Sequence, residues 1–206
     1  DIATIPYNTL QDTYISRIRL ATLIAANDTI SNNIAQMPIF PLYSFEFGML
    51  HGAVDGQKFT MATPTTKARY GKKYYGKGKG VVAYSLLCNH VPLQTYLLGS
   101  NDHESYFAFD IWYNNSSEIT PQILTGDMHI LNKANSVIMY WFDGKLYPRF
   151  TSIENQLQYL YCEKWLDKYD NCNIKPRGEI NRKLIEDEAD NLERIIATLG
   201  SGEVSQ

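Results

Sequence analysis

Apolar residues recur every three or four positions between about residues 9 and 38, in LQDTYISRIRLATLIAANDTISNNIAQM. This spacing predicts a helix, and the two prolines of the following PIFPLY predict where it ends. From about residue 46 the pattern changes to short apolar runs, MLHGAV, GVVAYSLLCNHV and QTYLLGS, which are typical of buried strands. We therefore expect a helical connector over residues 1–45 and a sheet that begins near residue 46.

Helical and strand-like segments then alternate. HESYFAFDIWYNN predicts a helix, QILTGD a strand, NKANSVIMYWF a second helix and KLYPRF a closing strand. Three strands, a helix, a strand, a helix and a strand predict a mixed α/β core over residues 46–150, built on one sheet. Beyond it, RKLIEDEADNLERIIATLG carries an apolar stripe and ends at Gly200, so we expect a helical extension over residues 151–206.

The composition excludes several classes of protein. Of 206 residues, 44% are hydrophobic and 20% charged, which is typical of a globular domain rather than a disordered chain. No apolar run approaches the roughly 20 residues of a membrane helix, so we expect no membrane partner. Cys88, Cys162 and Cys172 are an odd number without C-x-x-C spacing, which predicts neither a disulfide framework nor a zinc ribbon and favours the cytoplasm.

Positive charge is concentrated in one segment, although the net charge is −3. KARYGKKYYGKGK, residues 67–79, has basic side chains and no acidic one, whereas half of the 22 acidic residues lie from Glu154 onwards. Lysines neutralise phosphates without reading base sequence, and tyrosines can pack on sugars or unstacked bases. We expect this segment to bind DNA, with a solvated hairpin loop as the alternative; its basic residues are Lys67, Arg69, Lys72, Lys73, Lys77 and Lys79.

Two aspartates each follow an apolar strand, Asp55 after MLHGAV and Asp127 after QILTG. The first and fourth strands of this order can be neighbours in a mixed sheet, which would place the two carboxylates side by side. Adjacent carboxylates repel each other unless a cation lies between them, and hard divalent cations prefer such oxygen ligands. The pattern predicts metal-assisted chemistry on a nucleic-acid backbone. The alternative is a turn aspartate, because Asp-Gly is a strong hairpin signal and is expected to form a turn at Asp143-Gly144.

Six motifs occur in a characteristic order: DGQKF, ARYGKKYYGKGKGVVAY, NDHESYFAFDIWYNN, TGDMH, PRF and INRKLIEDEADNLERIIATLG. Together they resemble the catalytic region of the Tn-three (Tn3) family of replicative, class II transposases over nearly the whole chain. The resemblance implies an RNase H-like core and a DDE enzyme that cuts the 3′ ends of a transposon and joins them to target DNA. It implies Mg²⁺ as cofactor, with Mn²⁺ as an alternative ion. It also implies transposon ends and target DNA as partners, a bacterial cytoplasmic protein found at the nucleoid when DNA-bound, and allows a homodimer of the full-length protein.

Individual roles follow from the matching positions. The resemblance makes Asp55 and Asp127 the first two catalytic acids and metal ligands. His129 would contact the scissile phosphate or orient Asp127, with a structural histidine as the alternative. Arg149, in PRF, would bind phosphate or anchor an acid. In NDHES, His103-Glu104 is expected to cap the following helix, with Asp102 or Asn101 at its start.

The family's third acid is a glutamate beyond the helix that resembles INRKLIEDEADNLERIIATLG, and this chain ends at Gln206, before that segment. We therefore expect weak Mg²⁺ binding and a polypeptide that is inactive, or nearly so, on its own. One alternative is a non-catalytic remnant that binds DNA or a transposase partner. Another is an RNase H-like nuclease that uses Glu186 or Glu188, although these acids fit the solvated face of an amphipathic helix better.

Overall fold

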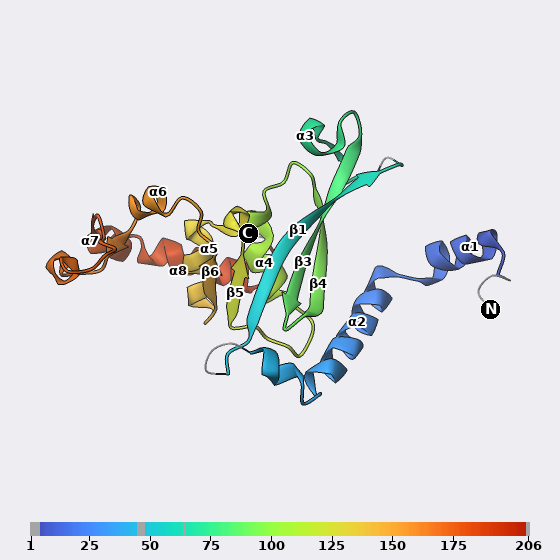
Figure 1. The fold of residues 1–206 in the computed structure, drawn as a ribbon, viewed down its shortest axis with the longest axis horizontal. Coiled ribbons are helices and arrows are strands. Elements are labelled where there is room, and N and C mark those ends of the chain that lie inside the picture. The colour runs from blue at the N-terminus through green and yellow to red at the C-terminus, as the bar shows by residue number, and fades with distance from the viewer. Residues whose placement is uncertain (1–4, 45–47, 64, 205–206) are drawn as a thin grey trace.

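A mixed sheet of six strands forms the centre of the protein in the computed structural model, which describes residues 5–44, 48–63 and 65–204 (Figure 1). Strands β1 (His51–Met61), β3 (Lys79–Cys88) and β4 (Val91–Gly99) are antiparallel neighbours, and the short β2 (Arg69–Tyr70) also pairs with β3. Strands β5 (Ile123–Gly126) and β6 (Lys145–Pro148) continue the sheet parallel to β1. This architecture confirms the predicted mixed α/β fold and is consistent with an RNase H-like core.

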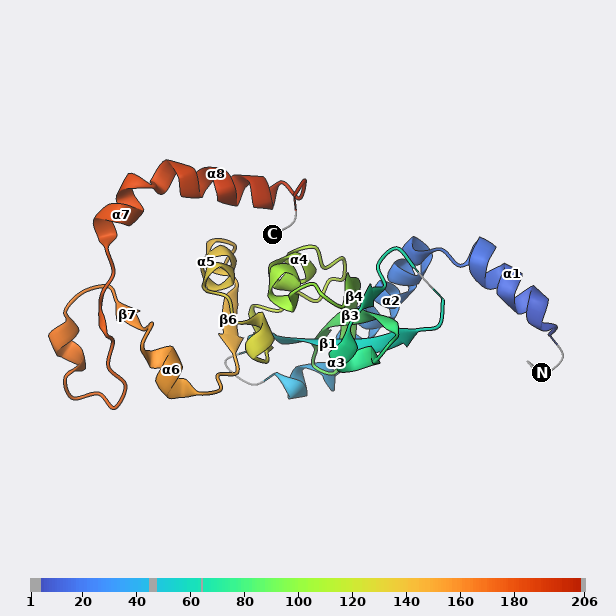
Figure 2. The ribbon, with the colours of Figure 1, turned by 90° about the horizontal axis from the view of Figure 1, so that it is seen from above.

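Helices cover one face of this sheet. The 3₁₀ turn η3 (Glu104–Phe107) leads into α4 (Ala108–Tyr113), and α5 (Lys133–Trp141) lies on the same side (Figure 2). Successive strand residues point to opposite faces, so Val54 is buried beneath these helices whereas Ala53 and Asp55 are exposed. The covered face forms the hydrophobic core, which includes Leu86, Phe109, Leu124 and Met139.

The predicted N-terminal helix is in fact two helices, α1 (Tyr7–Arg17) and α2 (Leu20–Ala35), followed by the 3₁₀ turn η2 (Phe40–Tyr43). Helix α2 lies along the outer edge of β4. The Asn27 side-chain amide donates to the backbone oxygens of Pro92 and Leu93, at 3.1 and 3.0 Å, and the Ser31 hydroxyl donates to Pro92 O at 3.1 Å. The predicted boundary at residues 45 and 46 falls outside the described residues. Across the described ranges, no helix has the length and apolar character needed to cross a bilayer.

The prediction of a wholly helical C-terminal region was wrong for its first half. Helix α6 (Ile153–Leu157) is followed by β7 (Tyr161–Cys162), the 3₁₀ turn η5 (Leu166–Tyr169) and β8 (Gly178–Glu179), and β7 and β8 pair in parallel. Pro176 and Gly178 disfavour helix there. The expected amphipathic segment forms α7 (Arg182–Asp187) and α8 (Ala189–Gly200), with Leu199 buried but Leu184 and Ile195 exposed.

The cysteines are expected to differ sharply in reactivity. Cys88 is buried on β3 and burial raises the pKa of its thiol to about 11, whereas Cys172 is exposed between η5 and β8. Because the thiolate is the reactive form, iodoacetamide at pH 8 should label Cys172 in the native chain and Cys88 only after unfolding in urea. Peptide mass spectrometry of native and unfolded samples measures this, and fast native labelling of Cys88 would contradict its burial.

Candidate functional site

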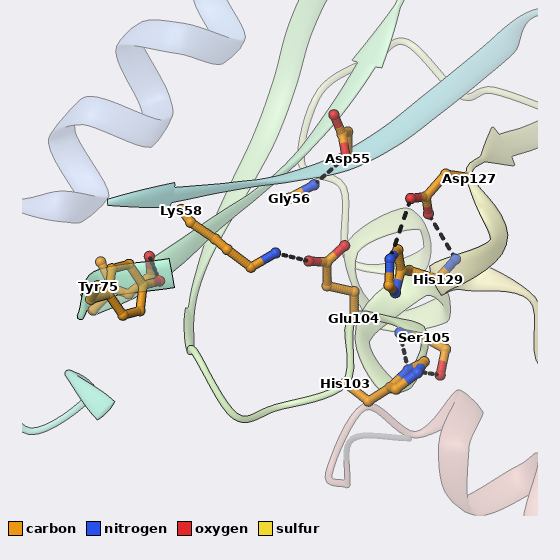
Figure 3. A network of polar contacts seen from close by, with 10 residues as sticks. Asp55, Gly56, Lys58, Tyr75, His103, Glu104, Ser105, Asp127 and His129 are labelled. Atoms are coloured by element: carbon orange, nitrogen blue, oxygen red, sulfur yellow. Dashed lines mark hydrogen bonds and ion pairs between the residues drawn. The ribbon is translucent and has the colours of Figure 1, made fainter. Parts of the chain in front are cut away.

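Asp55 and Asp127 lie side by side although they are far apart in the sequence. The parallel pairing of β1 with β5 ends at Val54 and Gly126; Asp55 is the next residue of β1, and Asp127 directly follows the last residue of β5. Because neighbouring strands lie about 4.8 Å apart, the register places the backbones of the two residues side by side. Figure 3 shows the Asp127 carboxylate turned towards His129 and the Asp55 carboxylate on the side of β1 away from Glu104. The structure therefore places the two positions next to each other, whereas their role as shared metal ligands stays a prediction.

Asp55 does not end a strand, contrary to the prediction. β1 continues to Met61 because its other edge stays paired with β3, from Gly52 opposite Cys88 to Met61 opposite Lys79. Asp55-Gly56 is consequently not a turn, whereas Asp143, with φ of 58°, lies in a turn as expected. Asp55 is thus held by β3 on one side and lies just beyond the end of β5 on the other.

A backbone N–H orients each carboxylate. The Gly56 N–H donates to Asp55 Oδ1 at 2.8 Å, and the His129 N–H donates to Asp127 Oδ1 at 2.8 Å (Figure 3). The second hydrogen bond makes Asp127 the N-cap of the 3₁₀ turn η4 (Met128–Ile130). Both side chains are exposed, so each can offer its other oxygen to a ligand.

His129 and Arg149 lie next to Asp127. β5 ends at Gly126, so the strand alternation expected to orient His129 does not apply; the η4 turn instead brings its Nε2 to 3.8 Å from Asp127 Oδ2. Arg149 follows β6, and its backbone N–H donates to Gly126 O at 2.8 Å. Since Gly126 is also opposite Pro148 in the β5–β6 ladder, Arg149 extends the same row of strand ends.

The basic segment, residues 67–79, is more structured than a hairpin loop. It contains β2 and the short helix α3 (Lys72–Tyr75), and it begins beyond the far end of β1, roughly 20 Å along the strand from Asp55 (Figure 1). Lys67 Nζ donates to Leu97 O at 2.8 Å and Arg69 Nη1 to Thr66 O at 2.6 Å, so each of these two cations already binds a backbone carbonyl group. All its basic residues are exposed, and no ion pair among the described residues involves any of them.

Tyr75 fixes α3 against β3. Its ring lies over Gly80, where an added Cβ would come within 2.2 Å of the ring, and its hydroxyl donates to Val81 O at 3.3 Å. Gly80 is therefore needed for close approach rather than for an unusual backbone angle. This packing sets the position of the basic segment relative to the sheet.

Sequence reasoning missed a second polar pair, Lys58 and Glu104. Lys58 Nζ lies 3.9 Å from Glu104 Oε1, and the Glu104 side chain is only 12% exposed. Glu104 occupies the space above Gly56, where a Cβ would lie 2.3 Å from Oε1. One signal was available, because Val54, Gly56 and Lys58 share the buried face of β1 and a lysine on such a face needs a partner.

Glu104 belongs to the electrostatic environment of the two aspartates. Burial is the main cause that raises its pKa, and the positive charges of Lys58 and His129 oppose this shift. The carboxylates of Asp127 and Asp55 raise the pKa of Glu104 further. Glu104 and Asp55 nevertheless lie on opposite sides of β1 (Figure 3).

The expected helix cap is only partly correct. His103 is the N-cap of η3, and its Nδ1 accepts the Ser105 N–H at 3.4 Å. Asp102 instead accepts the Gly99 N–H at 2.9 Å, so it closes the turn after β4 and does not begin the helix. Glu104 faces β1, as described above, because the turn at Asp102 directs η3 back over the sheet.

The described residues offer part of a metal site. No group of three His, Cys, Asp or Glu side chains among them is arranged to hold a metal ion. The oxygen donors of Asp55 and Asp127 nevertheless fit a hard divalent ion, which retains several water ligands. Glu186 and Glu188 are exposed at the α7–α8 junction, which lies beyond β6 and far from β1 in both views (Figures 1 and 2), so they do not complete the site.

Comparison with known proteins gives two matches. A family model described as the Tn3 transposase DDE domain matches residues 1–206. The transposase for transposon Tn4556 of Streptomyces fradiae is 23% identical over 188 residues, which cover 91% of this chain and 20% of that protein. The chain therefore spans about a fifth of the length of that relative. No solved structure matches the chain.

Proposed function

Since the chain belongs to the Tn3 transposase DDE domain family, we propose that it carries part of a catalytic centre for DNA strand cleavage and strand transfer in replicative transposition. Residues 46–150 are the proposed catalytic core, and residues 1–45 and 151–206 flank it. The observation that carries this proposal is the register of three parallel strands, which brings Asp55, Asp127 and Arg149 into one row.

Asp55 and Asp127 are the proposed ligands of Mg²⁺, for which Mn²⁺ can substitute. When bound there, the ion would neutralise charge on the phosphate and favour deprotonation of the attacking oxygen. The chain contributes rigidity, because the pairing of β1 with β3 holds Asp55 and the η4 cap holds Asp127. Both acids are exposed beside the end of β5, where a DNA backbone can approach.

The proposed reaction consists of two displacements at phosphorus. A water oxygen first bonds to the phosphorus at the transposon end, and the bond to the 3′ oxygen breaks to release a 3′-hydroxyl. That hydroxyl then attacks a target phosphate and displaces the 3′ oxygen of the target strand. Neither step needs a covalent intermediate with the enzyme. Arg149 and His129 would hold the non-bridging phosphate oxygens during both steps.

The basic segment is the proposed DNA-binding element outside the metal site. Its cations have no acidic partner among the described residues, so they are available to phosphates. A remnant that binds DNA without turnover is the second candidate, because no group of three acids that could hold a metal ion occurs within the described residues.

Binding and cleavage measured together test this proposal. Fluorescence anisotropy should show that the chain binds a random-sequence duplex, and replacing Lys72, Lys73 and Lys77 by Ala should lower the slope of log K against log salt by about two to three. Nicking of supercoiled plasmid with Mg²⁺ or Mn²⁺ should be slow or undetectable. Absence of DNA binding would overturn the proposal. Fast nicking by the wild type that is lost in Asp55→Asn would show that the chain holds a complete catalytic centre and not part of one.

A further inference from the structure

Lys58 lies between the aspartate pair and the basic segment. Its ammonium is 3.9 Å from Glu104 Oε1 and 4.3 Å from the centre of the Tyr74 ring on α3. The ion pair is at the long limit of such contacts, and the Lys58 side chain is 29% exposed. The two contacts therefore hold the Lys58 ammonium in place but leave it accessible to solvent. An incoming anion can bind only to a cation that is accessible in this way.

The edge of β1 that carries Lys58 is open. β5 pairs with β1 only as far as Val54, so no described strand covers that edge from Asp55 onwards. Lys58 lies about 10 Å beyond Asp55 along the strand. The two side chains project to opposite faces of β1, so a phosphate backbone that reaches both must run along this edge rather than across a face. The same path leads towards α3 and its lysines.

We propose that Lys58 binds a DNA phosphate next to the one acted on at the aspartate pair, and that Glu104 is a positioning residue that holds the Lys58 ammonium until DNA arrives. This inference rests on the proposed function. It adds a DNA contact outside the basic segment and gives a role to a buried carboxylate that the reaction itself does not use. The ligand is the sugar-phosphate backbone, without base preference, since an ammonium recognises charge alone.

The Glu104 carboxylate has a second possible hydrogen-bond donor for the time when Lys58 moves to a phosphate. A buried carboxylate that loses its counter-ion needs another hydrogen-bond donor. Tyr84 is opposite Gly56 in the β1–β3 ladder, so its ring shares the face of the sheet on which Glu104 lies. Its hydroxyl is buried without a hydrogen-bond partner in the part of the chain that the structure describes. Burial, and then the charge of Glu104, raise the pKa of Tyr84, so the hydroxyl stays protonated and can donate.

A purely structural role makes a different prediction. If Lys58 only anchors η3 to β1, its loss lowers the unfolding temperature but leaves the number of phosphate contacts unchanged. Counter-ion release separates the two roles, because each phosphate contact contributes about 0.9 to the slope of log K against log salt. The test therefore measures DNA affinity as a function of salt together with thermal unfolding.

The whole chain is titrated with a short random-sequence duplex in EDTA between about 50 and 200 mM salt. Lys58→Met should lower the slope by about one, whereas Lys58→Arg should retain it. Glu104→Gln should keep the wild-type slope and tighten binding about twofold, because phosphate no longer competes with a carboxylate. The matched control is Lys145→Met, at the start of β6 and the opposite end of the strands from Asp127, which should change nothing.

Equal slopes for the wild type and a folded Lys58→Met variant would overturn this inference and leave the proposed function standing. If Lys58→Met does not fold, the double variant Lys58→Met/Glu104→Gln carries the same slope prediction without an unpaired buried charge. A wild-type chain that binds no DNA at any salt concentration would overturn the proposed function itself, and the inference with it.

Discussion

Asp55→Asn or Asp127→Asn is expected to weaken Mn²⁺ binding to the chain by about tenfold or more, as removal of a ligand should cost at least as much as loss of a ligand's supporting contact. Each substitution keeps the size of the side chain and its amide oxygen can still accept the orienting backbone N–H. The loss would therefore report the missing negative charge rather than a displaced strand. Electron paramagnetic resonance of free Mn²⁺ measures the binding, and Mg²⁺ should compete for the same site.

Two variants serve as matched controls for this experiment. Glu188→Gln removes an exposed carboxylate at the α7–α8 junction, and Asp143→Asn removes one at a turn with φ of 58°, which Asn also tolerates. Neither should alter Mn²⁺ binding. Loss of binding in Glu188→Gln would instead support the alternative nuclease, in which a late helix supplies an acid of the site.

Asn135→Ala is expected to lower the unfolding free energy by roughly 2–4 kcal/mol, the second large effect. Asn135 is fully buried on α5, and its amide donates to Ser105 O at 2.7 Å and to Ile130 O at 3.4 Å. It therefore joins η3, which carries Glu104, to η4, which follows Asp127. Alanine removes these two hydrogen bonds and leaves a cavity.

Thermal unfolding followed by circular dichroism should show a decrease of roughly 5–15 °C in the midpoint for this variant. Asn173→Ala, at an exposed position before β8, is the control and should unfold with the wild type. Similar midpoints for the two variants would show that the buried amide does not connect the two turns as described.

The apolar runs and their order were sufficient to predict the sheet and the placement of its two aspartates on neighbouring strands. Val54 and Leu86 lie on the covered face as the pattern requires, and the strand order predicted that β1 and β5 could be neighbours. The pattern did not show how far β1 extends. DGQKFT contains turn-forming and polar residues, yet it remains a strand because β3 supplies a full antiparallel partner as far as Met61.

Contacts between segments distant in the sequence, together with one local turn, account for what the pattern could not predict. The role of Glu104 depends on the space above Gly56, and no local rule connects those two positions. His129 approaches Asp127 through a 3₁₀ turn that replaces the expected strand. Lys67 belongs to a basic cluster in the sequence, but its ammonium is bound to the Leu97 carbonyl of another strand. The contacts of Glu104 and Lys67 depend on tertiary packing, which overrides a local signal, whereas His129 is placed by the local η4 turn.

The contact of α2 with β4 bears on how the protein behaves at high concentration. An edge strand with free backbone groups can recruit a strand from another molecule and start aggregation. Here the Asn27 amide and the Ser31 hydroxyl already bind the carbonyl groups of Pro92 and Leu93, and Pro92 has no N–H to donate. Helix α2 thus protects the first residues of this edge strand from pairing with a strand of another molecule.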